Sequence, residues 1–442
     1  MANSNGWGDG AANNAIGWGQ GANNAIAWGD SHAKSWAGAT DIVGFDASSI
    51  SYFNATGITG ATQQDAIDNL IRGLKADGLW SKMKAVYPFV TDNKNLLSYT
   101  EDFTRSSYWG KDAGVTATSN TTTAPDGTNT ADTITLPLDA TSAIYTQPAV
   151  TALTTYTVSF YIKATSGEAG NTVCFRTNPG LTTNMITLTN DWVRYSVVVT
   201  PTSGTWSIEW GRKNSATATS FYLWGAQLEL GSTATTYQPI ATTQQAYIAS
   251  QFKYNLVNPV DSDAAFRLVF NGGWTHSSTG ATPNGTNGYA DTKLVPSSSL
   301  STSSAHLSYY SRTNVNQASY DLSSSQHYSL LLYQNKFYVN LETSGQYNAT
   351  QVLTNTTGYY IGSRINNTNV NGYRNGIKTI NNIAQNSTLS AQPLFLAATN
   401  NGQYFSSKQV AFTSIGDGLT DIDATNLYSR VNTFQVALSR NV

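Results

Sequence analysis

Charged residues are scarce in this sequence. Only 11% of the 442 residues are Asp, Glu, Lys or Arg, against roughly 25% in an ordinary globular protein. The formal net charge is −2, which gives no electrostatic basis for binding nucleic acid. Hydrophobic residues still make up 40% of the chain and aromatic residues 12%. Ser, Thr, Asn and Gly replace the missing charge, and this mixture favours short β-strands joined by tight turns rather than a helical enzyme.

Cysteine is almost absent. Cys174 stands alone, so no intrachain disulfide can form, and stability has to come from packing or oligomerisation. The first residues, Met1 to Gly6, lack the basic and apolar regions of a signal peptide. No run approaches the ~18 apolar residues of a membrane span. We therefore expect a protein that is made in a cytoplasm, uses no ordinary secretion signal and does not insert into a membrane.

The residue patterns of common catalytic sites are also missing. Glycan-cleaving enzymes need two carboxyl groups ~5 to 10 Å apart, and no Glu-x-Asp-x-x-Glu run occurs. Glu342 has no acidic partner at strand spacing, Glu209 stands alone, and Glu229 follows a strand. There is no Gly-x-Ser-x-Gly nucleophile motif, and nothing favours Cys174 as a nucleophile. We expect no catalytic residues and no enzyme; a glycan depolymerase whose site is assembled from distant loops remains an alternative.

No metal-ligand spacing is evident. The four histidines do not pair and have strand or turn neighbours, which favours structural, hydrogen-bonded roles; they are His32, His276, His306 and His327. Three aspartates precede a predicted helix without a later bidentate Glu, which favours helix capping over a calcium loop; they are Asp417, Asp421 and Asp423. We expect no cofactor and no metal site, with a structural calcium ion possible elsewhere in either predicted sandwich.

A short tryptophan repeat occupies the N-terminus. Gly6–Ile16 is echoed by Gly17–Ile26, and a decayed third copy opens at Ala27. Such Gly- and Asn-rich units cannot bury a core of their own, so their large aromatic side chains need another surface. We interpret residues 1–49 as an extended arm that anchors the chain to neighbouring subunits through Trp7, Trp18 and Trp28. A flexible tail is the alternative.

Two helices are predicted near the ends of the remaining chain. Thr62 and Asp65 suggest a capping box before an apolar stripe at helical spacing, and Gly78 is the expected end. Thr420 and Asp423 suggest a second capped helix, whose inner face is Leu427, Val431, Phe434 and Leu438. Between these helices the sequence alternates as strands do, and the clearest runs are 156–162, 192–199, 329–333 and 336–341. The turn at 335–336 predicts a hairpin.

Residues 95 to about 240 contain four characteristic segments: Asn95–Phe103 with Trp109, Ala124–Thr128, Tyr156–Lys163 and the closing Phe221–Glu229. Through these segments the stretch resembles the carbohydrate-binding-module-like jelly rolls of phage structural proteins. It implies a β-sandwich that can bind sugars and sometimes carries a structural ion.

A second set of segments follows in the C-terminal half: Asp263–His276, Asn284–Asp291, His306–Ser311 and Ser414–Thr420. Through these segments the chain resembles a concanavalin-like (laminin-G-like) domain found in phages of Bacteroidetes hosts. In similar proteins the segment 80–88 leads almost directly into the one before Asp263. We therefore predict a domain inserted at residues 95–240 into a discontinuous parent domain, 50–94 plus 241–442.

Sugar recognition on β-sandwiches uses aromatic ring faces together with polar side chains. Tyr222 and Trp224 share one side of a predicted strand, while Phe221 and Leu223 share the other, so one of the two sets has to be core. The carbohydrate-binding candidates are Trp206, Trp210, Tyr222 and Trp224. For any single tryptophan, the core is favoured over a sugar platform.

Together these features predict a mainly β protein with two β-sandwich or jelly-roll domains, a few short helices and the N-terminal arm. Because of the two resemblances, we expect a structural component of a bacteriophage virion, assembled in the bacterial cytoplasm. A tail fibre or other surface appendage that binds host glycans is favoured, and a capsid-decoration or head-fibre protein without a specific ligand is the alternative. A homo-oligomer, for instance a trimer, is expected because phage appendages are symmetric.

Overall fold

Most of the regular structure consists of antiparallel strands, as expected from a sequence rich in Thr, Tyr and Val and punctuated by Gly and Asn. A computed structural model of the chain describes residues 44–442, apart from 140, 179–181, 325–327, 344–349, 387 and 400–401. The fold is mainly β, and this prediction is confirmed. The predicted anchor residues Trp7, Trp18 and Trp28 lie outside the described residues, as does the predicted arm up to residue 43. The last residues assigned to the arm, 47–49, instead belong to helix α3 (Ala47–Thr56).

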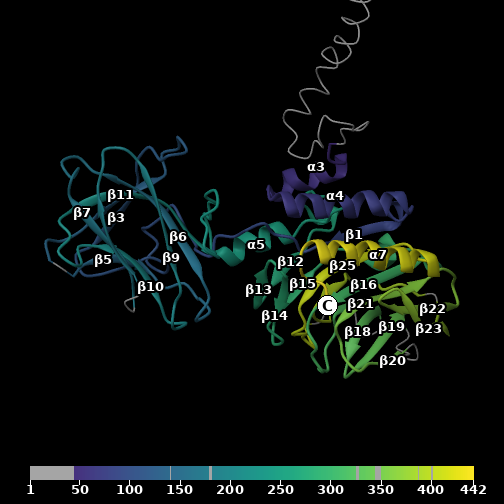
Figure 1. Ribbon diagram of the computed structural model, residues 1–442. Helices are drawn as coiled ribbons and strands as arrows, with labels where there is room; N and C mark the ends of the chain where they lie inside the picture. Colours follow the sequence, from purple (N-terminus) through teal and green to yellow (C-terminus); the bar gives the residue numbers. More distant parts are fainter. Residues whose placement is uncertain are drawn as a thin grey trace, which may run out of the picture. The chain divides into compact units, whose positions relative to one another are not determined.

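The chain divides into two compact units. One consists of residues 93–249, and the other of the described residues before Asn93 together with Ser250–Val442. Each unit contains two sheets (Figure 1). The sequence predicts an inserted domain over residues 95–240, whereas the compact unit extends to Ala249 and so includes the first part of helix α5 (Gln244–Phe252).

The 93–249 unit is a sandwich of two five-stranded antiparallel sheets, in the orders β2-β5-β10-β7-β8 and β3-β4-β11-β6-β9. Its strands are β2 (Gly110–Lys111), β3 (Thr116–Thr122), β4 (Ala131–Thr135), β5 (Ala143–Thr146), β6 (Tyr156–Ala164), β7 (Thr172–Asn178), β8 (Thr182–Thr187), β9 (Val193–Val199), β10 (Ser207–Gly211) and β11 (Ser220–Leu230).

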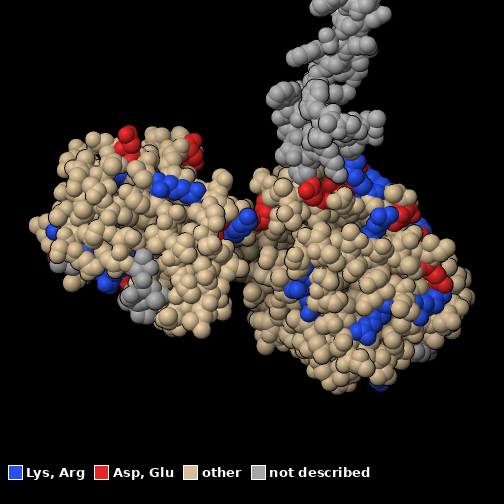
Figure 2. Space-filling view, viewed as in Figure 1, with Lys and Arg blue, Asp and Glu red and all other residues tan. Residues whose placement is uncertain are grey.

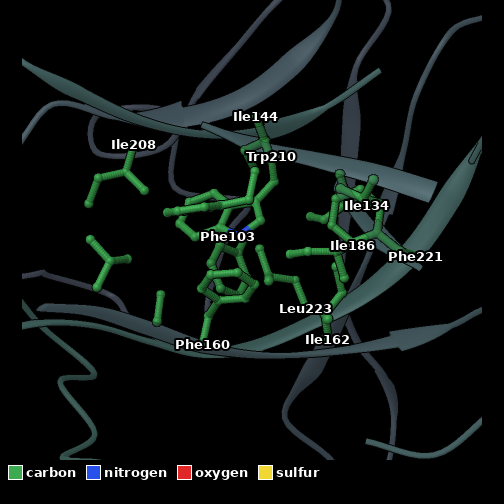
Figure 3. Packing of buried hydrophobic residues seen from close by; sticks show 14 of the residues in the cluster. Phe103, Ile134, Ile144, Phe160, Ile162, Ile186, Ile208, Trp210, Phe221 and Leu223 are labelled. Atoms are coloured by element: carbon green, nitrogen blue, oxygen red, sulfur yellow. The ribbon is translucent and has the colours of Figure 1, made fainter. Parts of the chain in front are cut away.

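The core of this unit lies between its two sheets. Alternate residues of each strand point inward, so β6 contributes Phe160 and Ile162 while β10 contributes Ile208 and Trp210. Figure 3 shows Trp210 between the two layers of strands, directed toward Phe103 and Phe160. The single cysteine, Cys174 on β7, is buried as a free thiol.

Hydrogen bonds hold the two ends of the 93–249 unit together. The Asn95 side chain donates to the backbone carbonyl oxygen of Gln238 (3.0 Å), and the backbone amide of Thr100 donates to the carbonyl oxygen of Ile240 (3.0 Å). Further along, the amide of Gln244 donates to Ser98 Oγ (2.9 Å). The chain therefore enters and leaves this unit at neighbouring positions, which is the geometry that an insertion requires.

The other unit is a larger sandwich, with an eight-stranded sheet (β13-β14-β25-β16-β21-β22-β23, with β1 paired to β25) and a seven-stranded sheet (β12-β15-β24-β17-β18-β19-β20). Its strands are β1 (Met83–Tyr87), β12 (Val269–Asn271), β13 (Trp274–Ser277), β14 (Gly280–Pro283), β15 (Tyr289–Asp291), β16 (Ala305–Ser311), β17 (Leu322–Ser323), β18 (Tyr328–Tyr333), β19 (Lys336–Leu341), β20 (Thr350–Val352), β21 (Gly358–Arg364), β22 (Asn369–Arg374), β23 (Ile377–Ala384), β24 (Phe395–Leu396) and β25 (Val410–Gly416).

One buried ion pair lies inside this larger sandwich. Lys408 Nζ is 3.3 Å from Asp321 Oδ1, and both side chains are fully buried. Ser406 Oγ also donates to Asp321 (2.9 Å), and Lys408 donates to Ser319 Oγ (2.8 Å). Buried charges are tolerated because they are paired and hydrogen-bonded.

Helices accompany the larger sandwich. They are α3 (Ala47–Thr56), α4 (Ala61–Ala76), the 3-10 turns η1 (Trp80–Lys82) and η2 (Asp263–Ala265), the short α6 (Pro296–Ser299) and α7 (Asp421–Ala437). The capping box at the start of α7 is present as predicted, since the Thr420 side chain accepts from the Asp423 amide and Asp423 accepts from the Thr420 amide. The predicted cap at Thr62 is wrong: the N-cap is Gly60, two residues earlier, and it makes no side-chain cap.

The predicted hairpin is formed by β18 and β19. Tyr333 and Lys336 are paired, and Gln334 and Asn335 make the two-residue turn with φ of 49° and 57°. Two successive positive φ values are characteristic of the type I′ turn, whose twist suits antiparallel strands.

Candidate functional site

Two of the four predicted sugar-stacking residues lie in the core. Trp206 is 2% exposed and Trp210 is 0% exposed. The Trp210 ring packs against Phe160, with centroids 5.1 Å apart, and Phe175, at 5.5 Å. Ile208 lies between the two tryptophans on the same face of the chain and joins the same cluster. Their even spacing places both rings on one side, but that side faces inward, so the structure assigns them to packing and not to an exposed platform.

The other two, Tyr222 and Trp224, lie on the outer face of the sheet that contains β11. Phe221 and Leu223 point into the core, so the residues between and after them point outward. A bulge follows at Gly225, where φ is +64° and the pairing with β6 shifts register. The bulge lets Ala226 rejoin the core although it is an odd number of residues from Leu223.

Tyr222 and Trp224 belong to an outer aromatic patch, which consists of Tyr161, Trp192, Tyr222, Trp224 and Tyr237. Ring centroids are 6.4 Å apart for Trp192 and Tyr222, 5.3 Å for Tyr161 and Trp224, and 4.6 Å for Trp224 and Tyr237. Trp224 is only 3% exposed, whereas the other four rings are partly exposed. Trp224 therefore supports the patch, and its neighbours supply the accessible ring surface.

Hydrogen bonds fix the tryptophans of this patch. Trp224 Nε1 donates to Thr130 Oγ1 (2.9 Å), and Trp192 Nε1 donates to the carbonyl oxygen of Thr123 (2.9 Å). The Tyr237 hydroxyl is 2.6 Å from Thr100 Oγ1. Aromatic rings whose polar atoms are already bonded are held in place before a ligand arrives, which lowers the entropic cost of binding.

Two cations lie over the rings of the patch. Lys163 Nζ is 6.0 Å from the ring centre of Trp192, and the Arg194 guanidinium is 5.5 Å from that of Tyr161. Arg194 Nη2 also donates to Ser159 Oγ (2.9 Å). Neither cation forms an ion pair with any residue that the structure describes. Uncharged residues dominate the face shown in Figure 2, with groups of Lys and Arg scattered between them. Cation–ring contacts also occur elsewhere among the described residues, for instance Lys253 over Tyr254 and Arg374 over Tyr360, so the patch is distinguished by having two of them on one group of rings.

The carboxylates considered as catalytic groups are each bound to neighbours. On the outer face of the opposite sheet, Glu209 is 2.7 Å from Arg176 Nε and 3.2 Å from Lys213 Nζ. Burial acts to raise the pKa of Glu209, but the hydrogen bonds from Arg176 and Ser207 and the Lys213 charge outweigh it and hold the pKa below its usual value. A carboxyl group in this state does not donate a proton near neutral pH.

The remaining two carboxylates also accept hydrogen bonds. Glu229 accepts from Gln227 Nε2 (2.6 Å) and the Thr235 amide (3.0 Å), and Glu342 accepts from the Asn386 amide (2.5 Å). These bonds give both groups a structural role at their strands.

No three His, Cys, Asp or Glu side chains come together as a metal site within the described part of the chain. The structural calcium ion that the sequence leaves open stays a prediction, because calcium is also bound by carbonyl and amide oxygens. His306 is buried, with Nδ1 2.6 Å from the Asp417 carbonyl oxygen and Nε2 3.0 Å from Ser414 Oγ, and burial lowers its pKa to about 4. His32 and His327 lie outside the described residues. Among the helices that the structure describes, none is long and apolar enough to cross a membrane.

The chain matches no protein-family model and no curated protein sequence. Its similarities to solved structures include the CBM22-1 xylan-binding domain from Paenibacillus barcinonensis Xyn10C, at 14% identity and a TM-score of 0.25, covering 34% of this chain and 96% of that domain. The enzymatically active domain of tailspike protein 4 from bacteriophage CBA120 is 17% identical with a TM-score of 0.24, covering 31% of this chain but 21% of that one. Similarities of this size carry no assignment of function.

Proposed function

We propose that this chain is a non-catalytic, glycan-binding structural component of a bacteriophage virion, a tail fibre or other surface appendage. The observation that supports glycan binding is the outer aromatic patch with its two cations. Pyranose rings present apolar C–H faces that stack on aromatic rings, and their hydroxyl groups accept hydrogen bonds from Lys163 and Arg194.

The phage assignment is supported by the two sequence resemblances. In this proposal the Trp-repeat arm, through Trp7, Trp18 and Trp28, holds the chain on other virion proteins, and the 93–249 unit is displayed to host polysaccharide. Symmetric assembly of several copies, for instance three, would multiply a weak single-site affinity by raising the effective concentration of the other sites.

Binding of the full chain to an array of bacterial surface polysaccharides tests the first part of the proposal. The strongest glycan is then titrated by calorimetry against Trp192→Ala, Tyr222→Ala and the control Met185→Ala. Met185 is 45% exposed on β8 of the opposite sheet. We expect each patch substitution to weaken binding by at least about fivefold, corresponding to about 1 kcal/mol, and the control to bind as the parent does.

Two outcomes would contradict glycan binding at the patch: no array signal above background, or equal losses for Met185→Ala and the patch variants. Fractionation of purified particles with an antibody against the chain tests the virion assignment. Detection in tails or surface fibres supports the appendage, whereas its absence from particles overturns the virion role. A copy number matching capsomers, with none in detached tails, would favour capsid decoration.

A further inference from the structure

A cavity of the 93–249 unit has a lining whose chemistry differs from that of the outer aromatic patch. We name it the side pocket. It has a volume of about 560 Å³ and is lined by Leu96, Leu97, Ser98, Ser106, Ser107, Tyr108, Gly110, Tyr145, Thr146, Gln147, Pro148, Ala149, Gln244 and Gln245. This volume lies in the range of small-ligand sites, about 300–1,000 Å³.

The lining of the side pocket contains no Lys, Arg, Asp, Glu or His. It combines two tyrosine rings with side-chain amides and hydroxyl groups, above all those of Gln147, Gln244 and Ser107. Amides and hydroxyls can both donate and accept hydrogen bonds. Such a lining favours an uncharged ligand with many groups that both donate and accept hydrogen bonds. A charged group would lose its hydration in this pocket without gaining a counter-charge.

The fold holds the tyrosines of this pocket in place. Gly110 of edge strand β2 is paired with Tyr145 of β5, and a Cβ at Gly110 would lie 2.4 Å from the Tyr145 ring. The glycine therefore allows the ring to lie directly on the backbone of β2. Tyr108 is 38% exposed and packs edge-on against Tyr99, with centroids 5.2 Å apart. The hydroxyl groups of Tyr108 and Tyr145 make no hydrogen bond with any residue that the structure describes.

The amide side of the pocket is also ordered. The Gln244 amide, at the start of α5, donates to Ser98 Oγ (2.9 Å), and Gln245 Nε2 donates to Gln244 Oε1 (2.7 Å). Two ordered glutamines thus lie on the same cavity as two partly exposed rings. A sugar ring presents two kinds of surface, C–H faces and neighbouring hydroxyl groups. The tyrosine rings of the pocket suit the C–H faces, and its glutamine amides suit the hydroxyl groups.

We propose that the side pocket is a binding site for a neutral saccharide, separate from the outer aromatic patch and independent of whether that patch binds. An extended peptide fits the same cavity less well. Peptides that add to a sheet edge gain affinity from a ladder of backbone hydrogen bonds, and β2 offers only Gly110 and Lys111.

The test uses the full chain and neutral hexasaccharides of glucose, mannose and galactose, with hexagalacturonate as the charged counterpart, titrated by calorimetry. Ser107→Trp places a bulky ring at an exposed position in the pocket, and Thr118→Trp is its control at an exposed position of β3 in the same unit. We expect that one neutral hexasaccharide binds Ser107→Trp at least tenfold more weakly than the parent chain. It should bind Gln147→Ala at least threefold more weakly. Thr118→Trp and Trp192→Ala should leave its binding unchanged.

The two sites fail in different ways. If neutral sugars bind but Trp192→Ala removes the binding while Ser107→Trp does not, the side pocket is not the site. If only hexagalacturonate binds, and through Trp192, the side-pocket proposal is overturned while glycan binding at the patch survives. The proposal is also overturned if no neutral sugar binds while a peptide from a random library does, and Ser107→Trp weakens the binding of that peptide.

Discussion

Trp210 provides a sharp test of how the aromatic residues divide between core and surface. Its ring is fully buried and lies within 5.1 to 6.0 Å of Phe160, Phe175 and Trp109. Truncation to alanine removes these contacts and leaves a cavity, for which a buried Trp→Ala costs about 3–5 kcal/mol. That is a large part of the ~5–15 kcal/mol that stabilises a typical domain. At about 2–4 °C per kcal/mol for a domain of this size, we expect the melting temperature to fall by roughly 6–20 °C.

Trp210→Phe separates packing from recognition. The buried indole N–H of Trp210 has no hydrogen-bond partner among the described residues, so phenylalanine removes an unsatisfied donor while keeping an aromatic ring. We expect a cost of only about 1–2 kcal/mol, since the smaller cavity is partly offset by the lost desolvation penalty. Scanning calorimetry of the full chain, followed by glycan titration of the same samples, measures both effects. A Trp210→Phe variant that melts like the parent yet loses glycan binding would refute the core assignment.

Three further predictions concern groups elsewhere in the fold. Lys408→Met should cost about 3 kcal/mol in urea unfolding because Asp321 stays buried with its charge unpaired; a neutral result would show that the ion pair is not needed. Burial raises the pKa of Asp132 to about 7, above its unfolded value, so its contribution to stability is full below about pH 4 and falls as the pH rises toward 7. Asp132→Asn should remove this decrease of the unfolding free energy with rising pH. If parent and variant differ in unfolding free energy by the same amount at pH 4.5 and at pH 7.5, the prediction is wrong. Thr420→Ala should lower the free energy of unfolding by about 1 kcal/mol through loss of the capping box, and Thr420→Ser should restore most of it.

The sequence predicts the elements better than it predicts which face of a strand is exposed. Alternation correctly separates Phe221 and Leu223 from Tyr222 and Trp224, but period-two spacing does not say which set faces the core. The same ambiguity explains Trp206 and Trp210, which share a side as predicted but face inward.

The residues that complete the outer aromatic patch come from separate strands. Tyr161 and Trp192 precede Tyr222 in the chain by tens of residues and meet it only through the pairing of β6 with β9 and β11. Such long-range register is not encoded in local periodicity. The sequence does not reveal the side pocket for the same reason, because its tyrosines and glutamines come from three segments far apart in the chain, around Tyr108, Tyr145 and Gln244.

Helix-start prediction fails where a carboxylate distant in the sequence replaces the local capping side chain. At Thr420 the side chains that cap α7 are local in sequence, so the motif is sufficient. At α4, Thr59 and Gly60 donate their amides to the distant Asp92 carboxylate instead, at 2.7 and 2.8 Å. The helix start is therefore fixed by a residue that no local pattern identifies, and Thr62 is left inside the first turn.

The hydrogen-bonded ends of the 93–249 unit have a consequence for how such a protein can change over time. A segment whose entry and exit are joined by Asn95–Gln238 and Thr100–Ile240 contacts imposes little on the chain that carries it. Recombination can then replace the whole segment, or duplicate it, while the carrier keeps its own strand pairing. Under the proposed function, ligand preference and assembly would then be inherited on separate segments, and a new surface chemistry would be acquired by exchange of one segment instead of by gradual remodelling of a shared core.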